Sequence, residues 1–292
     1  MIGYKIAYTE GKRVLVTLNI PDDALTNINR DGVKDIKYAK HVCNKANVVS
    51  IEDERGNGCE EAQSSNHSKK SVKYIVGEEI VECNYAKEIL LISGEAFTFF
   101  LDRQVALLYG LSQVENGEYK KWFDNGQLEI HCYYENGKLQ GEYTKWFMNG
   151  NLERHAFYNE GKVEGEYKRW YLNGNLYEQF YYREGELDGE SKWWYTNTQL
   201  ASHTFYKKGN LDGEFKWWHR GEDDLNKSGQ IYIDAFFKDG KYEGDYKCWY
   251  SNGVLCVETF YKNGKIDGKY QEWDINGEII KDEMYVNGEK IN

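Results

Sequence analysis

Proline is almost absent from this chain of 292 residues, which contains only Pro21 and has no apolar run of the roughly 18 residues that a membrane-spanning helix requires. The first residues mix lysine and glutamate with apolar side chains, so they lack the uninterrupted apolar segment of a signal peptide. The six cysteines show no paired spacing. We therefore expect an intracellular chain whose cysteines are reduced.

Catalytic motifs are also missing from the sequence. There is no nucleophile elbow and no zincin helix, and the isolated Gly56-x-Gly58 lacks the spacing of a phosphate-binding loop. These absences predict a protein that is not an enzyme and that uses no cofactor.

Positive charge is scarcer than negative charge. The chain has 37 Lys and Arg against 48 Asp and Glu, a net charge of −11. Residues 1–110 contain 14 basic and 16 acidic residues, which leaves a net charge of −9 for residues 111–292. Because an acidic surface repels phosphate groups, we expect no nucleic-acid partner and no binding to anionic lipid headgroups.

Glycine and tryptophan, in contrast, recur with a fixed period. Seven segments begin with a glycine and follow one another by 24 residues, except for one step of 31. These glycines are Gly117, Gly141, Gly165, Gly189, Gly213, Gly244 and Gly268. A tryptophan stands five residues after each of them. Such a period is the signature of a repeat protein.

Each repeat contains two turn signals. The first is Asn-Gly, as at Asn125-Gly126, and the second is a residue followed by glycine eleven positions later, as at Asn136-Gly137. Asn-Gly accepts the positive φ values of a type I′ turn, and the segments between turns are rich in Tyr, Trp and Phe, as strands are. The pattern predicts a mainly β fold with about 14 antiparallel strands in sequential order and almost no helix over residues 115–290.

The repeat resembles the MORN repeat in its variant form, which reads roughly G-x-Y-x-x-W-Y-x-N-G-x-L with a second aromatic residue and glycine. The resemblance covers about residues 115–290. It implies an elongated, twisted, single-layer antiparallel sheet. The usual roles of the family are scaffolding, dimerisation and, for some members, membrane association, and no catalytic residues are implied.

Aromatic residues at shared repeat positions form a candidate binding ladder. Because neighbouring residues of a strand point to opposite faces, both faces of the sheet carry aromatics, and the sequence leaves open which face is buried. The ladder is expected to form mainly the core of the sheet, although it could also hold a partner protein. Its members are Tyr119, Trp122, Tyr143, Trp146, Tyr167, Trp170, Trp194, Phe215, Trp218, Tyr246, Trp249, Tyr270 and Trp273. A second set shares another repeat position: Phe157, Tyr181, Phe205, Phe236 and Phe260.

Three repeats depart from this pattern. The fourth has Ser191 where the others have an aromatic residue. The seventh carries charges such as Asp282 where earlier repeats are more apolar, as capping repeats do. The fifth has seven additional residues within positions 220–228, and loop tips tolerate such insertions. The candidate contact residues of this loop are Glu222, Asp223 and Asp224.

Residues 1–110 precede the repeats, and their pattern predicts a small α+β domain. Residues 111–116 connect this domain to the repeat region of residues 117–292. Alternating apolar residues predict a hairpin over residues 1–20, a strand at 47–51 and a pair of strands over 73–83 that is broken at Gly77. The segment before residue 47 is expected to form a short helix or loop. Residues 94–109 are expected to run from a strand into a helix that starts near Asp102.

The segments CNKANVVSI, YIVGEEI and FFLDRQVALLY occur in an order that resembles an uncharacterised N-terminal domain of large DNA viruses of the mimivirus and marseillevirus kind. That domain is found there beside pentapeptide or MORN-type repeats. The resemblance covers about residues 36–110, and Ser93 and Ala96 depart from the family pattern. It transfers no known activity, but it implies a viral source and hence the host cytoplasm or the virion.

Two groups of residues could supply metal ligands. The first comprises His131, His155 and His203. These share one repeat position, but an intervening strand separates equivalent positions by about 9.6 Å, whereas zinc–nitrogen bonds measure about 2 Å. The second comprises His41, Cys43, Cys59, His67 and Cys83, which include no C-x-x-C pair. We therefore expect no metal site.

These observations favour a non-enzymatic scaffold or adaptor whose long sheet presents a repeating face to another protein. A structural role in a virion is one version of this hypothesis. A peripheral membrane protein is the first alternative. An enzyme housed in residues 1–110 is the second, and it would require a pocket with converging polar groups there.

Overall fold

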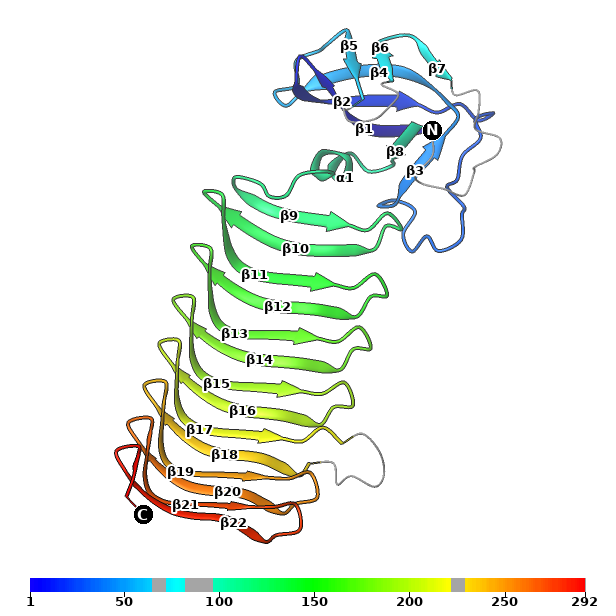
Figure 1. The fold of residues 1–292 in the computed structure, drawn as a ribbon. Coiled ribbons are helices and arrows are strands. Elements are labelled where there is room, and N and C mark those ends of the chain that lie inside the picture. Colours follow the sequence, from blue (N-terminus) through cyan, green and yellow to red (C-terminus); the bar gives the residue numbers. More distant parts are fainter. Residues whose placement is uncertain (65–71, 82–96, 222–228, 292) are drawn as a thin grey trace. The chain divides into compact units, whose positions relative to one another are not determined.

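The computed structural model describes residues 1–64, 72–81, 97–221 and 229–291 (Figure 1). Contacts divide the chain into two compact units, Met1–Gly137 and Lys138–Asn292. The first repeat hairpin belongs to the first unit, and the later hairpins make up the second. The described part of the chain is mainly β, as predicted, with one short helix in the N-terminal region.

The N-terminal region forms a sheet of eight strands. They are β1 (Ile2–Thr9), β2 (Lys12–Asn19), β3 (Lys40–Cys43), β4 (Lys45–Asp53), β5 (Glu61–Gln63), β6 (Lys73–Ile75), β7 (Glu79–Val81) and β8 (Phe97–Phe100). The strand order is β3-β8-β1-β2-β4-β7, and β5 pairs with both β1 and β6. The hairpin predicted over residues 1–20 is confirmed as β1 and β2, which pair from Ile2 with Asn19 to Thr9 with Lys12.

Two local expectations for this region are wrong. The segment before residue 47 is not a helix or loop, because β3 pairs along its length with β8 and buries His41, Val42 and Cys43. The strands on either side of Gly77 do not pair with each other. Instead, β6 pairs with β5 and β7 pairs with β4, and Gly77, at φ 87°, donates its N–H to the carbonyl of Val48. Both errors arise because pairing partners lie far away in the sequence.

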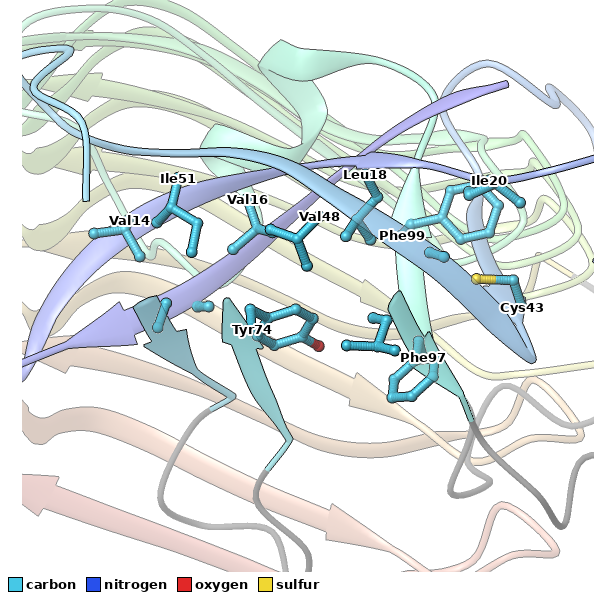
Figure 2. Packing of buried hydrophobic residues seen from close by; sticks show 14 residues of the cluster. Val14, Val16, Leu18, Ile20, Cys43, Val48, Ile51, Tyr74, Phe97 and Phe99 are labelled. Carbon is cyan, nitrogen blue, oxygen red and sulfur yellow. The ribbon is translucent and has the colours of Figure 1, made fainter. Parts of the chain in front are cut away.

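The main apolar core lies on one face of this sheet (Figure 2). Val14, Val16 and Leu18 alternate along β2, so their side chains share that face and meet residues of β4 such as Val48. Tyr74 of β6 lies across from them, fully buried, and its hydroxyl has no hydrogen-bond partner among the residues that the structure describes. Burial of these side chains supplies the main stabilisation of the region.

Helix α1 (Arg103–Leu108) begins where the sequence predicts. The Asp102 carboxylate caps it by accepting hydrogen bonds from the N–H groups of Gln104 at 2.9 Å and Val105 at 3.1 Å. Val105 and Ala106 then join Leu15 and Phe100 in a second apolar cluster, on the opposite side of the β1–β2 hairpin from the main core.

The repeat region forms one sheet of 15 antiparallel strands in sequential order. The strands are β9 (Gly117–Trp122), β10 (Leu128–Glu135), β11 (Lys138–Trp146), β12 (Leu152–Asn159), β13 (Lys162–Trp170), β14 (Leu176–Arg183), β15 (Glu186–Trp194), β16 (Leu200–Lys207), β17 (Asn210–Trp218), β18 (Ile231–Lys238), β19 (Lys241–Trp249), β20 (Leu255–Lys262), β21 (Lys265–Trp273), β22 (Ile279–Val286) and β23 (Glu289–Lys290). The prediction of about 14 sequential strands is confirmed, and the additional strand is β23, with two residues. No described residue between 115 and 290 is helical, also as predicted.

The two turns of each repeat differ from the expectation for Asn-Gly. At the first turn only one residue has positive φ, a glycine such as Gly126 with 87° or, in the fourth repeat, Thr198 with 72°, and five residues separate strands such as β11 and β12. The tight two-residue turn is the second one, where both residues have positive φ, as at Asn136 with 49° and Gly137 with 70°. That pair of values is the mark of a type I′ turn.

From Gly165 onward, the leading glycine of each repeat lies inside a strand, at a bulge in the pairing. Gly213 in β17 has a φ of 130°, and a Cβ atom placed on it would lie 2.9 Å from the Cβ atom of Phe205 in β16. Gly244 occupies the same position in the next repeat with a φ of 84°, and a Cβ atom there would meet open space. The repeat therefore needs glycine here for its backbone conformation everywhere, and for close contact only in some repeats.

We predict that Gly213→Ala lowers the free energy of unfolding of the repeat region by about 2–3 kcal/mol, because it combines backbone strain with a clash. Gly244→Ala is the matched control and should cost only about 1 kcal/mol, since it adds strain without a clash. Urea unfolding of the two variants, followed by tryptophan fluorescence, measures both values. A loss at Gly244 as large as that at Gly213 would contradict the assigned close contact.

Candidate protein-interaction face

The sheet of residues 138–292 has two faces of different character. In one row of cross-strand neighbours, Tyr143 faces Ala156, which faces Tyr167, and we call the face that carries this row the buried face. Glu142 and Phe157 are cross-strand neighbours on the other side, which we call the exposed face. Pairing continues the first row through Phe180, Ser191, Thr204, Phe215, Ala235, Tyr246, Thr259, Tyr270 and Glu283.

The tyrosines of the predicted ladder lie on the buried face and pack between neighbouring strands. Small residues of the same row are buried most completely, with Ala156 at 0% and Ala235 at 4% exposure. Tyr167 meets the ring of Tyr182 edge-on at 5.7 Å, and Tyr246 meets Tyr261 at the same distance. Burial raises the pKa of Tyr246 to about 12. This half of the ladder thus provides the cohesion between repeats.

The tryptophans of the ladder lie on the opposite side from these tyrosines. By strand alternation Trp146 shares the face of Glu142, and its cross-strand neighbour is Leu152; Trp170 faces Leu176 in the same way. All of the ladder tryptophans are half-buried. The structure therefore does not bring the predicted ladder together as one site.

The fourth repeat shows how the buried face tolerates the loss of its aromatic residue. Ser191 is 3% exposed, and its hydroxyl has no hydrogen-bond partner among the described residues. Trp193, two positions further on the same face, stacks on Phe180 with 6.3 Å between ring centroids. It also meets Trp217 edge-on at 6.3 Å. Trp193, although 36% exposed, thus gives the fourth repeat an aromatic contact on this face, and the fifth repeat has Trp217 at the same position in addition to Phe215.

A buried carboxylate also lies on this face. Glu178 is 5% exposed, and its carboxylate accepts a hydrogen bond from Nη1 of Arg169 at 3.2 Å. Burial raises the pKa of Glu178, and the Arg169 guanidinium opposes that shift only in part. The guanidinium also lies 5.4 Å from the centre of the Tyr177 ring. Because the side chain of Arg169 is 39% exposed, water solvates its charge better than that of Glu178.

The exposed face carries a straight row in which acidic and large apolar side chains alternate. In strand order the row contains Glu142, Phe157, Glu166, Tyr181, Glu190, Phe205, Glu214, Phe236, Asp245, Phe260, Lys269 and Met284. Only the last repeat replaces the acid, by Lys269. We call the apolar members of this alternating row (Phe157, Tyr181, Phe205, Phe236, Phe260 and Met284) the aromatic row.

The aromatic row has an apolar side chain in every repeat of this unit, exposed in four of them and half-buried at Tyr181 and Phe205. Phe157 is 46% exposed, Phe236 44% and Phe260 41%. The sequence shows the shared position of these residues, but it does not show that this position faces solvent. Each is followed directly by a second aromatic residue, as Phe157 is followed by Tyr158, and the structure places that second residue on the buried face.

The charges beside the aromatic row are paired with one another. Lys192 binds Glu190 at 2.7 Å, and this hydrogen bond is the main cause that holds the pKa of Glu190 below its usual range. The histidines considered as a metal column pair with acids of the row instead, His155 with Glu142 at 2.9 Å and His203 with Glu190 at 2.7 Å. Four of the five acids of the row, all except Asp245, thus have an ion-paired or hydrogen-bonded neighbour among the described residues.

Hydrogen bonds between successive turns keep the repeats in register. At the first turn, the hydroxyl of Tyr171 donates to the carbonyl of Trp194 at 2.7 Å, and that of Tyr195 donates to Trp218 at 2.9 Å. At the second turn, a carboxylate of the preceding repeat accepts the turn N–H; Glu243 accepts that of Asn263 at 2.7 Å. Both edges of the sheet thereby hold the aromatic row at a constant spacing.

The first repeat hairpin, which belongs to the first unit, is attached to the N-terminal region through its Asn-Gly turn. Arg30 donates to the carbonyl of Asp124 at 2.8 Å, and the N–H of Lys34 donates to that of Asn125 at 2.8 Å. The rings of Tyr38 and Trp122 stack at 5.3 Å with an interplanar angle of 17°. The residues before the repeats thus cover the edge of this hairpin that carries its first turn.

The remaining candidates are settled in part. Cys248 and Cys256 form a disulfide, so the expectation of reduced cysteines is wrong for this pair. They lie eight residues apart, and β19 and β20 bring their Cα atoms to 5.5 Å.

Among the residues that the structure describes, no three His, Cys, Asp or Glu side chains are grouped to hold a metal, and no helix is long and apolar enough to span a membrane. The candidates outside the described residues are His67, Cys83, Glu222, Asp223 and Asp224.

Comparisons with known families match both parts of the chain. Residues 1–106 match a family of unknown function, DUF5758. Residues 115–136, 132–144, 163–184, 187–208 and 242–263 match the MORN repeat variant, in line with the resemblance of the repeat region. Neither description names an enzymatic activity. A search of curated proteins found no match.

We predict that Glu178→Gln stabilises the repeat region at neutral pH by up to about 1 kcal/mol, because it removes a buried charge while Arg169 stays solvated. Since folding raises the pKa of Glu178, the wild-type side chain favours folding below the usual value of 4.5 and opposes it increasingly as the pH rises through the folded pKa. The advantage of the variant should therefore vanish in acid. Urea unfolding of both proteins at about pH 4 and pH 7 measures it, and a variant that is less stable at both values would contradict the assignment.

Proposed function

We propose that the repeat region is a non-enzymatic scaffold that binds another protein along the aromatic row. The observation that carries this proposal is the solvent exposure of Phe157, Phe236 and Phe260 at one repeated position of a rigid sheet. Solvent-exposed apolar side chains gathered in one place commonly mark sites of protein interaction. Matches to the MORN repeat variant support a role in protein or membrane interaction.

Charge favours a protein over a membrane surface or nucleic acid as the partner. The chain has a net charge of −11, and the lysines beside the row are already engaged, as Lys168 is by Glu166 at 2.8 Å. A phosphate-rich surface would have to displace these acids and would be repelled by the rest of the chain. A peripheral membrane protein would therefore have to bind only by inserting the apolar side chains of the aromatic row into the lipid.

The proposal extends to the N-terminal region and to location. We assign residues 1–110 the role of a second contact or a localisation signal, with residues 111–116 as the connection to the repeats. The resemblance of residues 36–110 to domains of large DNA viruses supports an intracellular site of action in a viral factory or virion. Detection of the chain in purified particles of its source by immunoblotting would test the virion version.

We predict that Phe157→Ala/Phe236→Ala abolishes the capture of specific partners, because it removes two of the most exposed rings of the row. Met148→Ala/Leu172→Ala is the matched control, since Met148 and Leu172 are 59% and 60% exposed but lie at turns outside the row. Proximity labelling in the native host, with wild type and both variants, identifies proteins that depend on the row. Unchanged labelling in the row variant, with unchanged folding by circular dichroism, would refute the proposed face.

Liposome flotation separates the membrane alternative from this proposal. Wild-type chain should stay with the unbound fraction on vesicles of phosphatidylcholine and on vesicles that contain phosphatidylserine. Flotation that is lost in Phe157→Ala/Phe236→Ala would assign the row to membranes instead of a protein.

A further inference from the structure

We infer that the partner segment that fits the aromatic row is a proline-rich chain in the polyproline II conformation. This inference rests on the proposed function, and it adds the chemistry of the occupant. The spacing of the row, which the strand pairing imposes, and the paired lysines of the surrounding face favour this occupant.

The spacing follows from the topology. Successive members of the row, such as Phe157 and Tyr181, lie on alternate strands of one sheet, and each pairs with the acid that precedes it in the row, Phe157 with Glu142 and Tyr181 with Glu166. Neighbouring strands lie about 4.8 Å apart, so one apolar side chain recurs about every 9.6 Å. The six members from Phe157 to Met284 span five such steps, about 48 Å.

Polyproline II matches this period better than the other regular conformations do. It has three residues per turn and a rise of about 3.1 Å, so every third side chain faces the same side at about 9.3 Å. The mismatch over five steps is then only about 1.5 Å. An α-helix returns to the same side after seven residues, about 10.5 Å, and drifts by about 4.5 Å over the row. An extended β-strand repeats at about 6.7 Å and loses register after one step.

The chemistry of the face fits an uncharged, apolar occupant. Beside the row, Lys216 pairs with Glu214 at 3.1 Å, Lys247 with Glu258 at 2.7 Å and Lys269 with Asp282 at 3.3 Å. A charged partner would have to compete with these pairs. Proline rings carry no charge and pack on aromatic rings, and the polyproline II helix is already ordered before binding, which lowers its entropic cost.

Neighbouring side chains hold the rings of the row in place. The hydroxyl of Tyr181 donates to the Glu166 carboxylate at 3.2 Å, and the ring of Phe205 lies 5.0 Å from that of His203. Phe205 also lies over Gly213, as the close approach of its Cβ atom requires. A row of such fixed rings at constant spacing favours a ligand that is itself regular and stiff.

The test uses the full-length chain and fluorescent peptides of 18 residues, slightly longer than the roughly 16 residues of polyproline II that cover about 48 Å. Oligoproline is the probe. A glycine–serine peptide of the same length and an alanine-based helical peptide are the controls. Fluorescence anisotropy should detect binding of oligoproline alone, and affinity should increase with each added turn from 6 to about 15 residues as more members of the row are engaged.

Variants connect this binding to the row. Phe157→Ala/Phe236→Ala should weaken oligoproline binding by about tenfold or more, as removal of central aromatic contacts does at protein interfaces. Met148→Ala/Leu172→Ala should leave it within about twofold. A Cβ atom at Gly165 or Gly244, which follow Phe157 and Phe236 in the next strand, would meet open space, so these two rings are not needed to cover a glycine, and circular dichroism should show both variants folded.

Three outcomes would overturn the inference: no binding of oligoproline at any length, equal binding of the control peptides, or binding that the row variant leaves unchanged. The proposed function can be judged separately. If proximity labelling still depends on Phe157 and Phe236 while oligoproline does not bind, the scaffold role stands and the polyproline II occupant is wrong. If both fail, the row is not the interaction face.

Discussion

In-register pairing of successive hairpins is the constraint on which the repeat region depends. Each strand from β9 to β22 is bonded to its sequence neighbours, so one displaced residue would move apolar side chains to the wrong face all along the sheet. Three devices recur along the repeats and prevent this: a type I′ turn, a longer turn closed by a left-handed residue (glycine except at Thr198), and a bulge at the leading glycine, as at Gly213. Hydrogen bonds such as that from Tyr171 to the carbonyl of Trp194 then join each turn to the next.

Because the register is fixed, one face of the sheet holds the strands together and the other is left to contact a partner. Small and aromatic residues of the buried row, from Ala156 to Tyr270, hold neighbouring strands together, and Trp193 adds a ring contact with Phe180 beside the small Ser191. The opposite side can then expose rings such as Phe157, Phe236 and Phe260 without loss of the core. Most of its charges have a local partner at the surface, and such exposed pairs add little stability.

The strands of the N-terminal region pair in a different way from those of the repeats. Its strands pair across long sequence distances, as β1 does with β8, and its two apolar clusters lie on opposite sides of the β1–β2 hairpin. The second cluster receives Trp122, and the stacking of Tyr38 on the same ring makes the first repeat hairpin part of this unit. Trp122 is half-buried like the other repeat tryptophans, but here it packs against residues of the N-terminal region.

Local rules were sufficient for the repeat period, the sequential antiparallel strands, the absence of helix in the repeats and the start of α1 at Asp102. All of these depend on residues close together in the sequence, such as a glycine at positive φ or a capping carboxylate. Tertiary structure alone decided which face is buried, the separation of the ladder tyrosines from its tryptophans, the pairing of β6 with β5 and the disulfide between Cys248 and Cys256. The physical reason is that strand alternation makes the two faces equivalent until neighbouring strands pack against one of them. Phe157 and Tyr158 are adjacent and chemically alike, and only the packing of the assembled sheet places the first in solvent and the second against Tyr143.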